Sequence, residues 1–227
     1  MAKTARVRII TPRFRVSFPD VFEKRTFQGQ GEESGRYSCA ALFEGFAVGP
    51  LKTGGTGTLI KAPEAWSKQE KDYWAKLIAE CNRVSMEAFK KPMGDLDRAV
   101  YKLPFHRGEE KEYTGYGPGI VYVTMSAKKV KPQVVHQRDI NVGIGPDELY
   151  AGCYARASVT PFAFTNIGKG IALGLNSIKK LGEGERLDSV RSAADDFGSD
   201  TEEFADEGAA DSGSGAAEVP ADEEEFA

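Results

Sequence analysis

The side chains that could support catalysis are few, and their spacing does not fit a known catalytic or metal site. His106 and His136 are the two histidines, and neither belongs to a ligand set with the spacing of a zinc site. Asp95 and Asp97 follow a helix terminator, where a solvated turn is the more common outcome. No serine lies in a G-x-S-x-G turn, and the Gly-x-Gly segments lack a phosphate-loop lysine. The sequence therefore predicts no metal, no cofactor and no enzymatic activity.

Basic and aromatic residues alternate in several stretches, a pattern that favours binding of a polyanion. All 30 Lys and Arg lie in residues 1–191 together with 21 of the 34 acidic residues, so this body carries a charge of +9. Arg and Lys can follow phosphates while aromatic rings stack on bases. The candidate DNA contacts are Arg13, Arg15, Arg36, Lys102, Phe105, Arg107, Tyr113, Tyr116, Lys128, Lys129, Lys131, Tyr150, Tyr154, Arg156 and Phe162.

The segment Tyr150–Thr160 reads as a strand with two different faces. One parity is small and apolar: Ala151, Cys153, Ala155, Ala157 and Val159. The other is aromatic and polar: Tyr150, Gly152, Tyr154, Arg156 and Ser158, followed by Phe162 and Phe164. The small face can pack tightly against a helix and leave the rings open for bases. In the alternative, the rings belong to the core and the small face meets solvent.

The chain ends in an acidic segment, Ser192–Ala227, with thirteen Asp and Glu and no Lys or Arg. It has too few large apolar residues to offset the entropy of ordering, so it is predicted to be disordered. A flexible acidic chain can also mimic phosphates and compete for a basic groove. The sequence thus predicts two parts: a folded domain over residues 1–191 and a tail over residues 192–227.

The elements that must position the candidate contacts are several strands and one long helix. Pro63 and Glu64 suit a helix start, Pro92 and Gly94 end it, and apolar residues recur between them at helical spacing. In the first strand, Phe14, Val16 and Phe18 should face away from the arginines. Strands are expected near residues 6–9, 13–18, 36–43, 99–105, 120–127, 150–160 and 171–181. This order predicts a mainly β, α+β domain or a small barrel with a helical insertion.

Cysteine content and hydropathy bear on the compartment. Cys39, Cys81 and Cys153 are odd in number and lie in apolar contexts, so we expect buried free thiols in a reducing cytosol. No signal peptide or apolar run of membrane length is visible. The expected location is the cytoplasm, without a membrane partner.

Three stretches together resemble a family of bacteriophage and prophage single-stranded-DNA-binding proteins, long known only as a domain of unknown function. They are residues 15–23 (RVSFPDVFE), 152–159 (GCYARASV) and 168–180 (GKGIALGLNSIKK). The resemblance implies an OB-fold, a five-stranded partly open barrel with the long helix inserted between strands. It places the central binding motif on Tyr154, Arg156 and Phe162 and implies sequence-independent binding in phage DNA replication, recombination and repair.

The resemblance also concerns the tail. The family is similar to podovirus replication proteins, whose acidic tails end in an aromatic residue and recruit replication enzymes. Here the aromatic residue is followed by Ala227. The implied partners are single-stranded DNA and a phage or host polymerase, helicase or nuclease in the host bacterial cytoplasm, with possible homo-oligomers on DNA. The implied partner-binding residues are Asp222, Glu223, Glu224, Glu225 and Phe226.

Two other classes of protein share the basic surface. A single-strand annealing protein would bring complementary strands together and form rings or filaments on DNA. An enzyme acting on DNA, such as a nuclease, would show metal-dependent turnover.

Overall fold

Five long strands form the framework of the domain. The structure is a computed structural model that describes residues 6–26, 34–47, 61–166 and 168–188. Its strands are β1 (Ile9–Ile10), β2 (Phe14–Arg25), β3 (Arg36–Phe43), β4 (Tyr101–Lys102), β5 (Phe105–Arg107), β6 (Val121–Ala127), β7 (Gln133–His136), β8 (Tyr154–Phe164) and β9 (Lys169–Gly182). One helix, α1 (Lys68–Phe89), and two 3₁₀ turns, η2 (Met93–Asp95) and η3 (Gly108–Glu110), complete the described elements.

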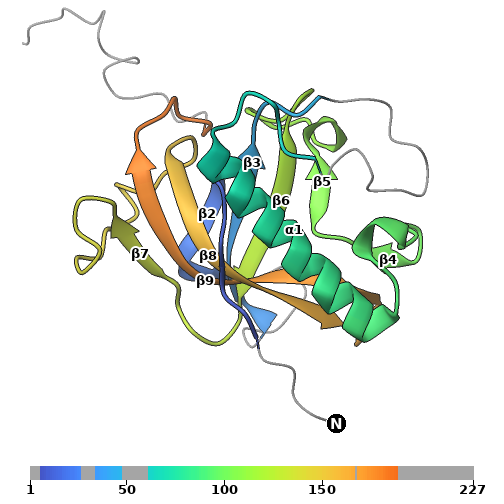
Figure 1. The fold of residues 1–227 in the computed structure, drawn as a ribbon. Coiled ribbons are helices and arrows are strands. Elements are labelled where there is room, and N and C mark those ends of the chain that lie inside the picture. Colours follow the sequence, from blue (N-terminus) through green and yellow to red (C-terminus); the bar gives the residue numbers. More distant parts are fainter. Residues whose placement is uncertain (1–5, 27–33, 48–60, 167, 189–227) are drawn as a thin grey trace, which may run out of the picture. The chain divides into compact units, whose positions relative to one another are not determined.

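The pairing of these strands closes a ring (Figure 1). Strands β2, β3 and β6 form an antiparallel meander, and β6 then pairs in parallel with β9. Strand β8 pairs with β9 along its length and returns to β2 at Phe14 and Arg15, which closes the circuit. A five-stranded ring with this mixed pairing is an OB-type barrel. The predicted mainly β fold with one long inserted helix is confirmed.

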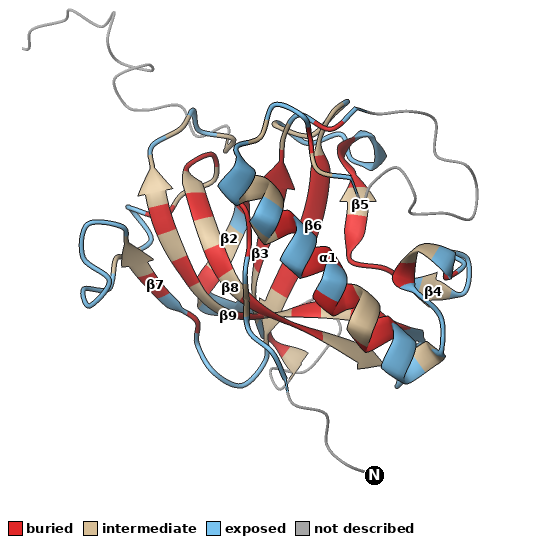
Figure 2. Cartoon of the chain, viewed as in Figure 1, coloured by how far each residue is buried: buried red, intermediate tan, exposed pale blue. Residues whose placement is uncertain are grey.

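Alternation along the ring strands separates a core from an outer surface (Figure 2). On β3 and β6 the inward residues are Cys39, Ala41, Phe43, Val121, Val123 and Met125, all fully buried. Trp74 of α1 is the largest buried side chain, and its ring lies 5.3 Å from that of Phe43 and 5.2 Å from that of Phe105. The helix therefore completes the core as well as covering it.

Helix α1 begins later than the sequence predicted. Pro63 was expected at its first turn, but Pro63–Trp66 forms a separate turn and the helix starts at Lys68. Ser67 is the reason, because its hydroxyl accepts a hydrogen bond from the Glu70 amide and caps the first turn. The helix is therefore about 33 Å long. It lies diagonally across the ring with its apolar face inward (Figure 1).

Several strands also differ from expectation. Strand β1 covers only Ile9–Ile10, and β2 continues to Arg25. The single strand predicted near residues 99–105 is split into β4 and β5, and β7 was not foreseen. Strand β8 begins at Tyr154 rather than Tyr150, because Gly152 has a φ of +113° and turns the chain. A Cβ atom at Gly152 would lie 1.9 Å from the Glu185 carbonyl oxygen, so only glycine fits this crossing.

The cysteines and the tail complete the comparison with the sequence. All three cysteines are buried and free, as predicted, and burial raises the pKa of the Cys39 and Cys81 thiols well above the usual range. The acidic tail predicted from Ser192 lies outside the described residues. Within the described ranges, no helix is long and apolar enough to span a membrane.

Candidate nucleic-acid interface

Five aromatic residues gather on the outer side of β2, β5 and β6 and on the loop before β6. We call Phe18, Tyr113, Tyr116, Tyr122 and His106 the aromatic patch. The Phe18 ring lies 5.2 Å from Tyr113, Tyr113 lies 5.7 Å from Tyr116, and Tyr116 lies 5.3 Å from Tyr122. His106 stacks on Tyr122 at 5.0 Å with the rings nearly parallel. Phe18 is 43% exposed and Tyr113 is 53% exposed, so these two rings form its open end.

Phe18 reaches the outer side through an unusual backbone conformation. Strict alternation along β2 predicts that Phe18 faces the core with Phe14 and Val16, and that prediction is wrong. The pairing of β2 with β3 shifts register between Ser17 and Asp20, and Phe18 has a φ of +46°. A bulky residue in the left-handed region costs roughly 1–2 kcal/mol. Such strain often marks a functional position, and here it exposes an aromatic ring.

Three titrating groups of the patch, Tyr116, Tyr122 and His106, are partly desolvated, and burial favours the neutral form of each. Burial raises the pKa of Tyr116, and it raises the pKa of Tyr122 to about 12. Burial also lowers the pKa of His106, against the opposing effect of Glu110, so its imidazole is neutral at pH 7. The Tyr116 hydroxyl lies 3.2 Å from the Ser17 hydroxyl, which fixes this ring on β2. The result is a neutral aromatic surface suited to stacking.

A second group of candidate residues lines an open cavity beside the start of α1. We call it the arginine cleft; its volume is about 520 Å³. Its walls include Arg13, Arg15, Leu42, Glu44, Trp66, Ser67, Glu70, Gln137, Tyr154 and Arg156. The Arg13 guanidinium lies over the Tyr154 ring at 5.0 Å, and the Arg156 guanidinium lies over the Tyr73 ring at 4.9 Å. The structure thus brings together four predicted contacts: Arg13, Arg15, Tyr154 and Arg156.

Strand β2 connects the cleft to the aromatic patch. Arg15 and Ser17 alternate with the buried Phe14 and Val16 on this strand, Ser17 is itself buried, and Arg13 directly precedes the strand. Arg13 and Arg15 line the cleft, while Ser17 contacts Tyr116 of the patch. The two groups therefore lie at successive positions along one strand.

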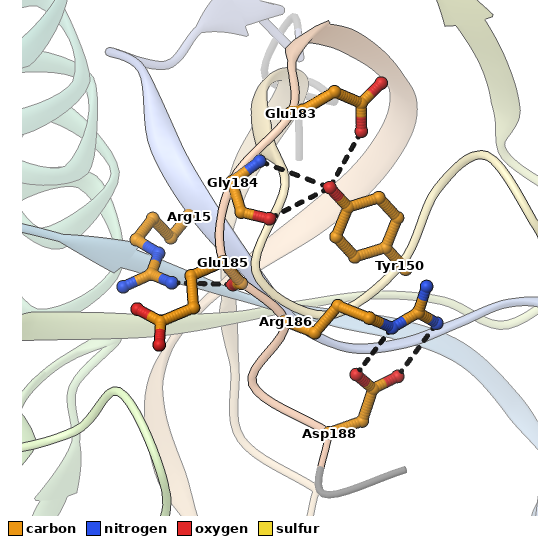
Figure 3. Close-up of polar contacts among 7 residues, drawn as sticks. All are labelled: Arg15, Tyr150, Glu183, Gly184, Glu185, Arg186 and Asp188. Carbon is orange, nitrogen blue, oxygen red and sulfur yellow. Dashed lines mark hydrogen bonds and ion pairs between the residues drawn. The ribbon is translucent and has the colours of Figure 1, made fainter. Parts of the chain in front are cut away.

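Arg15 is held by the segment that follows β9 (Figure 3). We call this segment, Glu183–Asp188, the strap. The Arg15 guanidinium donates to the Glu185 carbonyl at 2.8 Å, and it lies 3.8 Å from the Glu44 carboxylate. The Leu187 amide donates to the Ala151 carbonyl at 2.9 Å. Arg15 is therefore both a cleft residue and an anchor for the last described segment of the chain.

Tyr150 has a structural role in the same anchor (Figure 3). Its hydroxyl lies 2.7 Å from the Glu183 carboxylate and 2.9 Å from the Gly184 carbonyl. Lys180 and Arg186 both contact its ring, at 5.2 and 4.6 Å. Tyr150 was predicted to contact DNA, but its ring and hydroxyl hold the strap.

The remaining basic candidates lie on other parts of the surface. Lys128, Lys129 and Lys131 are exposed after β6, and the Lys131 ammonium lies 5.8 Å from the Phe22 ring. Arg36 is exposed at the start of β3, opposite Arg25. Lys102 is exposed on β4. The structure gathers none of these into the cleft, and the DNA contacts expected of them stay predictions.

Phe162 lies on the outer face of the β8–β9 hairpin, away from the partners predicted with it. A Cβ atom at Gly174 would lie 3.6 Å from the Phe162 ring, and one at Gly170 would lie 2.9 Å from the Phe164 ring. The two phenylalanines thus cover glycines on the neighbouring strand. This cross-strand packing gives the residue 168–180 motif a structural purpose, and a DNA contact at Phe162 stays a prediction.

Two further candidates are buried. Phe105 is 1% exposed and packs on Trp74, so its predicted contact with DNA is wrong. Arg107 is also buried and pairs with Glu109 at 3.6 Å, because it lies on β5 between the core and the η3 turn. A phosphate contact at Arg107 stays a prediction.

The two faces of β8 follow one of the two arrangements left open by the sequence. Cys153, Ala155, Ala157 and Val159 are buried in the core, so the small face is inward. The opposite face was expected to be open, but the first turns of α1 cover part of it. Arg156 is therefore bound to the Glu70 carboxylate and is only 17% exposed.

Sequence reasoning did not select several residues of these sites. They are Phe18 and Tyr122 in the patch and Trp66 and Glu70 in the cleft. His106 lies in a basic and aromatic stretch that the sequence did indicate. For Phe18 the RVSFPDVFE stretch did contain a signal, because Pro19 directly after it indicates an interrupted strand. The position of Glu70 depends on helix docking and left no local signal.

The domain is a five-stranded OB-type barrel that carries aromatic side chains and arginines on its outer side. This is the architecture of oligonucleotide-binding OB-fold proteins. Comparison with known families agrees with this class. Residues 62–208 match the family described as "Enterobacter phage Enc34, ssDNA-binding protein". The match covers well over half of the chain, so the chain belongs to this family, and the family predicted from the three motifs is confirmed.

Individual relatives are distant in sequence. The structure of the single-stranded DNA-binding protein from bacteriophage Enc34 in complex with ssDNA is 18% identical, with a TM-score of 0.54 over 80% of this chain and 89% of that chain. The single-stranded DNA-binding protein gp2.5 encoded by bacteriophage T7 is 14% identical, with a TM-score of 0.44 over 88% of this chain and 98% of that chain. A putative protein, p50, of Acyrthosiphon pisum secondary endosymbiont phage 1 is 23% identical over 75% of this chain and 81% of that protein.

Proposed function

We propose that this chain binds single-stranded DNA with little sequence preference and protects replication and recombination intermediates of a phage in the bacterial cytoplasm. The observation that carries the proposal is the alignment of the aromatic patch and the arginine cleft along β2. Family membership supports it, because the family is described by single-stranded DNA binding.

The two surfaces have complementary roles in this proposal. Phe18 and Tyr113 offer exposed ring faces, and stacking accepts any base because every base has a π-face. Arg13 and Arg156 contribute positive charge for the phosphates beside the Tyr154 ring. Lys128, Lys129 and Lys131 extend the positive surface after β6. A strand of DNA following β2 would then meet rings at one end and guanidinium groups at the other.

The acidic tail is proposed to regulate access and to recruit partners. Ser192–Ala227 carries thirteen carboxylates next to a body of charge +9, so it stays at high effective concentration near that body. In free protein it competes weakly with DNA. Bound DNA displaces it and leaves Asp222–Phe226 available to a polymerase, helicase or nuclease.

One titration tests both parts of this proposal. The full-length protein should bind a labelled oligo-dT much better than a duplex of equal length, with log affinity falling by about 0.7 per phosphate contact for each log unit of salt. A chain truncated after Arg191 should bind the same oligonucleotide more tightly, most strongly at low salt, where screening is least. Equal affinity for duplex, or no salt dependence, would refute the binding proposal. Identical curves for the two chains at low salt would refute tail competition alone.

A further inference from the structure

We infer that the Glu70 carboxylate occupies the position of a DNA phosphate in the arginine cleft and limits the affinity of the free protein for DNA. The inference rests on the proposed function and concerns how the cleft is controlled. Glu70 lies in the first turn of α1 and lines the cleft beside Arg13 and Arg156.

The contacts of this carboxylate are those that a phosphate group would make. One oxygen of Glu70 accepts a hydrogen bond from the backbone amide of Arg13 at 2.7 Å. The other is bound by the Arg156 guanidinium. A backbone amide and a guanidinium are a common pair of donors to phosphate oxygens. Glu70 therefore fills an anion position built by strand β8 and by the segment that precedes β2.

The pair has access to solvent and spare donor capacity. Glu70 and Arg156 each keep 17% of their side-chain surface exposed, at the edge of an open cavity of about 520 Å³. The buried Nε of Arg156 has no hydrogen-bond partner among the described residues. A DNA phosphodiester presents two non-bridging oxygens, as a carboxylate does, so it can replace Glu70 on the same two donors.

The rings beside the pair fit the same ligand. Tyr154 lies under Arg13, and Trp66 lines the cleft next to Ser67. A phosphate on Arg156 would place its neighbouring nucleotide within a cavity that contains both rings. Tyr73, under the Arg156 guanidinium, keeps that group in place when its acidic partner leaves.

The charges that face the cleft show why Glu70 decides its affinity. Three arginines line it, Arg13, Arg15 and Arg156, and two acids, Glu44 and Glu70. Arg15 lies near the Glu44 carboxylate and donates to the Glu185 carbonyl, so its positive charge is partly neutralised. The Glu70 carboxylate then offsets much of the remaining positive charge of Arg13 and Arg156. When DNA binds at this position, a phosphate must displace the Glu70 carboxylate. With a neutral residue at position 70, the phosphate would bind without displacing an anion.

The test compares two variants that each remove one negative charge from α1. Glu70→Gln keeps the shape and can still accept from the Arg13 amide, but it loses the ion pair with Arg156. Asp72→Asn removes the same charge two residues away, at an exposed position. Both are prepared in the full-length chain, and each is titrated with labelled oligo-dT across a salt series, with thermal unfolding as a control for folding.

We expect Glu70→Gln to bind oligo-dT about fivefold more tightly at low salt, the upper range for a partly exposed ion pair. Its salt slope should steepen by up to about 0.7, the value of one phosphate contact on a single strand. Asp72→Asn should change affinity less than twofold. In an Arg156→Ala background, the gain from Glu70→Gln should disappear, because the phosphate position has lost its guanidinium.

The outcomes separate this inference from the proposed function. If wild-type protein fails to bind oligo-dT, the proposed function is wrong. If wild type binds but Glu70→Gln binds equally or less tightly, Glu70 positions Arg156 and does not compete, and the inference is wrong. The inference is also wrong if Asp72→Asn tightens binding as much as Glu70→Gln, because the effect is then one of overall charge.

Discussion

A Phe18→Gly, Tyr113→Ala double variant should bind single-stranded DNA about 2–6 kcal/mol more weakly than wild type, since each stacked ring contributes about 1–3 kcal/mol. These rings form the open end of the aromatic patch and contact each other at 5.2 Å. Because they are exposed, their removal leaves the core intact. Titration with labelled oligo-dT measures the loss directly.

The stability of the same variant distinguishes a functional ring from a structural one. Glycine adopts a positive φ without penalty, so Phe18→Gly should relieve part of the strain at φ +46°. This relief opposes the loss of the ring contacts, so the double variant should unfold at a temperature close to that of wild type while binding DNA poorly. Tyr113→Phe is the matched control, and it should bind normally because it keeps the ring. A double variant that binds as wild type does would exclude the patch from the interface.

The second large effect concerns the strap. A chain truncated after Gly182 should lose about 3–5 kcal/mol of folding free energy, since hydrogen bonds to charged groups contribute about 1.5–3 kcal/mol each. It lacks the Glu185 carbonyl bound by Arg15, the Glu183 and Gly184 partners of Tyr150, and Leu187. A chain truncated after Asp188 keeps all of these contacts and should unfold as the full-length chain does. Chemical denaturation of the two truncations provides the comparison.

A point variant tests the strap in the full-length chain. Gly152→Ala would place a Cβ atom 1.9 Å from the Glu185 carbonyl oxygen, at a φ of +113°. The strap must then move, so this variant should be destabilised about as much as the truncation after Gly182. Gly145→Ala is the matched control, because its added Cβ meets no atom within 4 Å. If the chains truncated after Gly182 and after Asp188 are equally stable, the strap does not contribute to the folding free energy and this prediction is wrong.

Local patterns were enough to predict the framework of this fold. Helical spacing of Leu77, Cys81 and Val84 predicted the buried face of α1. Alternation separated the small residues Ala155 and Ala157 from the rings of the same strand but left open which face is the core; in the structure the small residues are buried. Both predictions depend on residues close in sequence. The motifs were also specific enough to indicate the family, which residues 62–208 confirm.

The site was harder to predict because its geometry depends on contacts between distant segments. A shift of register exposes Phe18, which alternation alone had placed inside. Phe105 sits in a basic and aromatic stretch, but the docking of Trp74 buries it. Arg156 was expected on an open face until α1 brought Glu70 onto it across 86 residues of sequence. In each case the local pattern identified the type of side chain. It could not indicate whether that side chain stays exposed once distant segments pack together.

The central claim is that DNA follows β2 from the arginine cleft to the aromatic patch. Ultraviolet crosslinking of the full-length protein to oligo-dT, followed by mass spectrometry of the peptides, tests it most directly. We expect the main crosslinks at Phe18, Tyr113 and Tyr154, reduced by an excess of unlabelled single strand and little affected by duplex. Crosslinks confined to the β8–β9 hairpin around Phe162, with none at Phe18 or Tyr113, would contradict the claim.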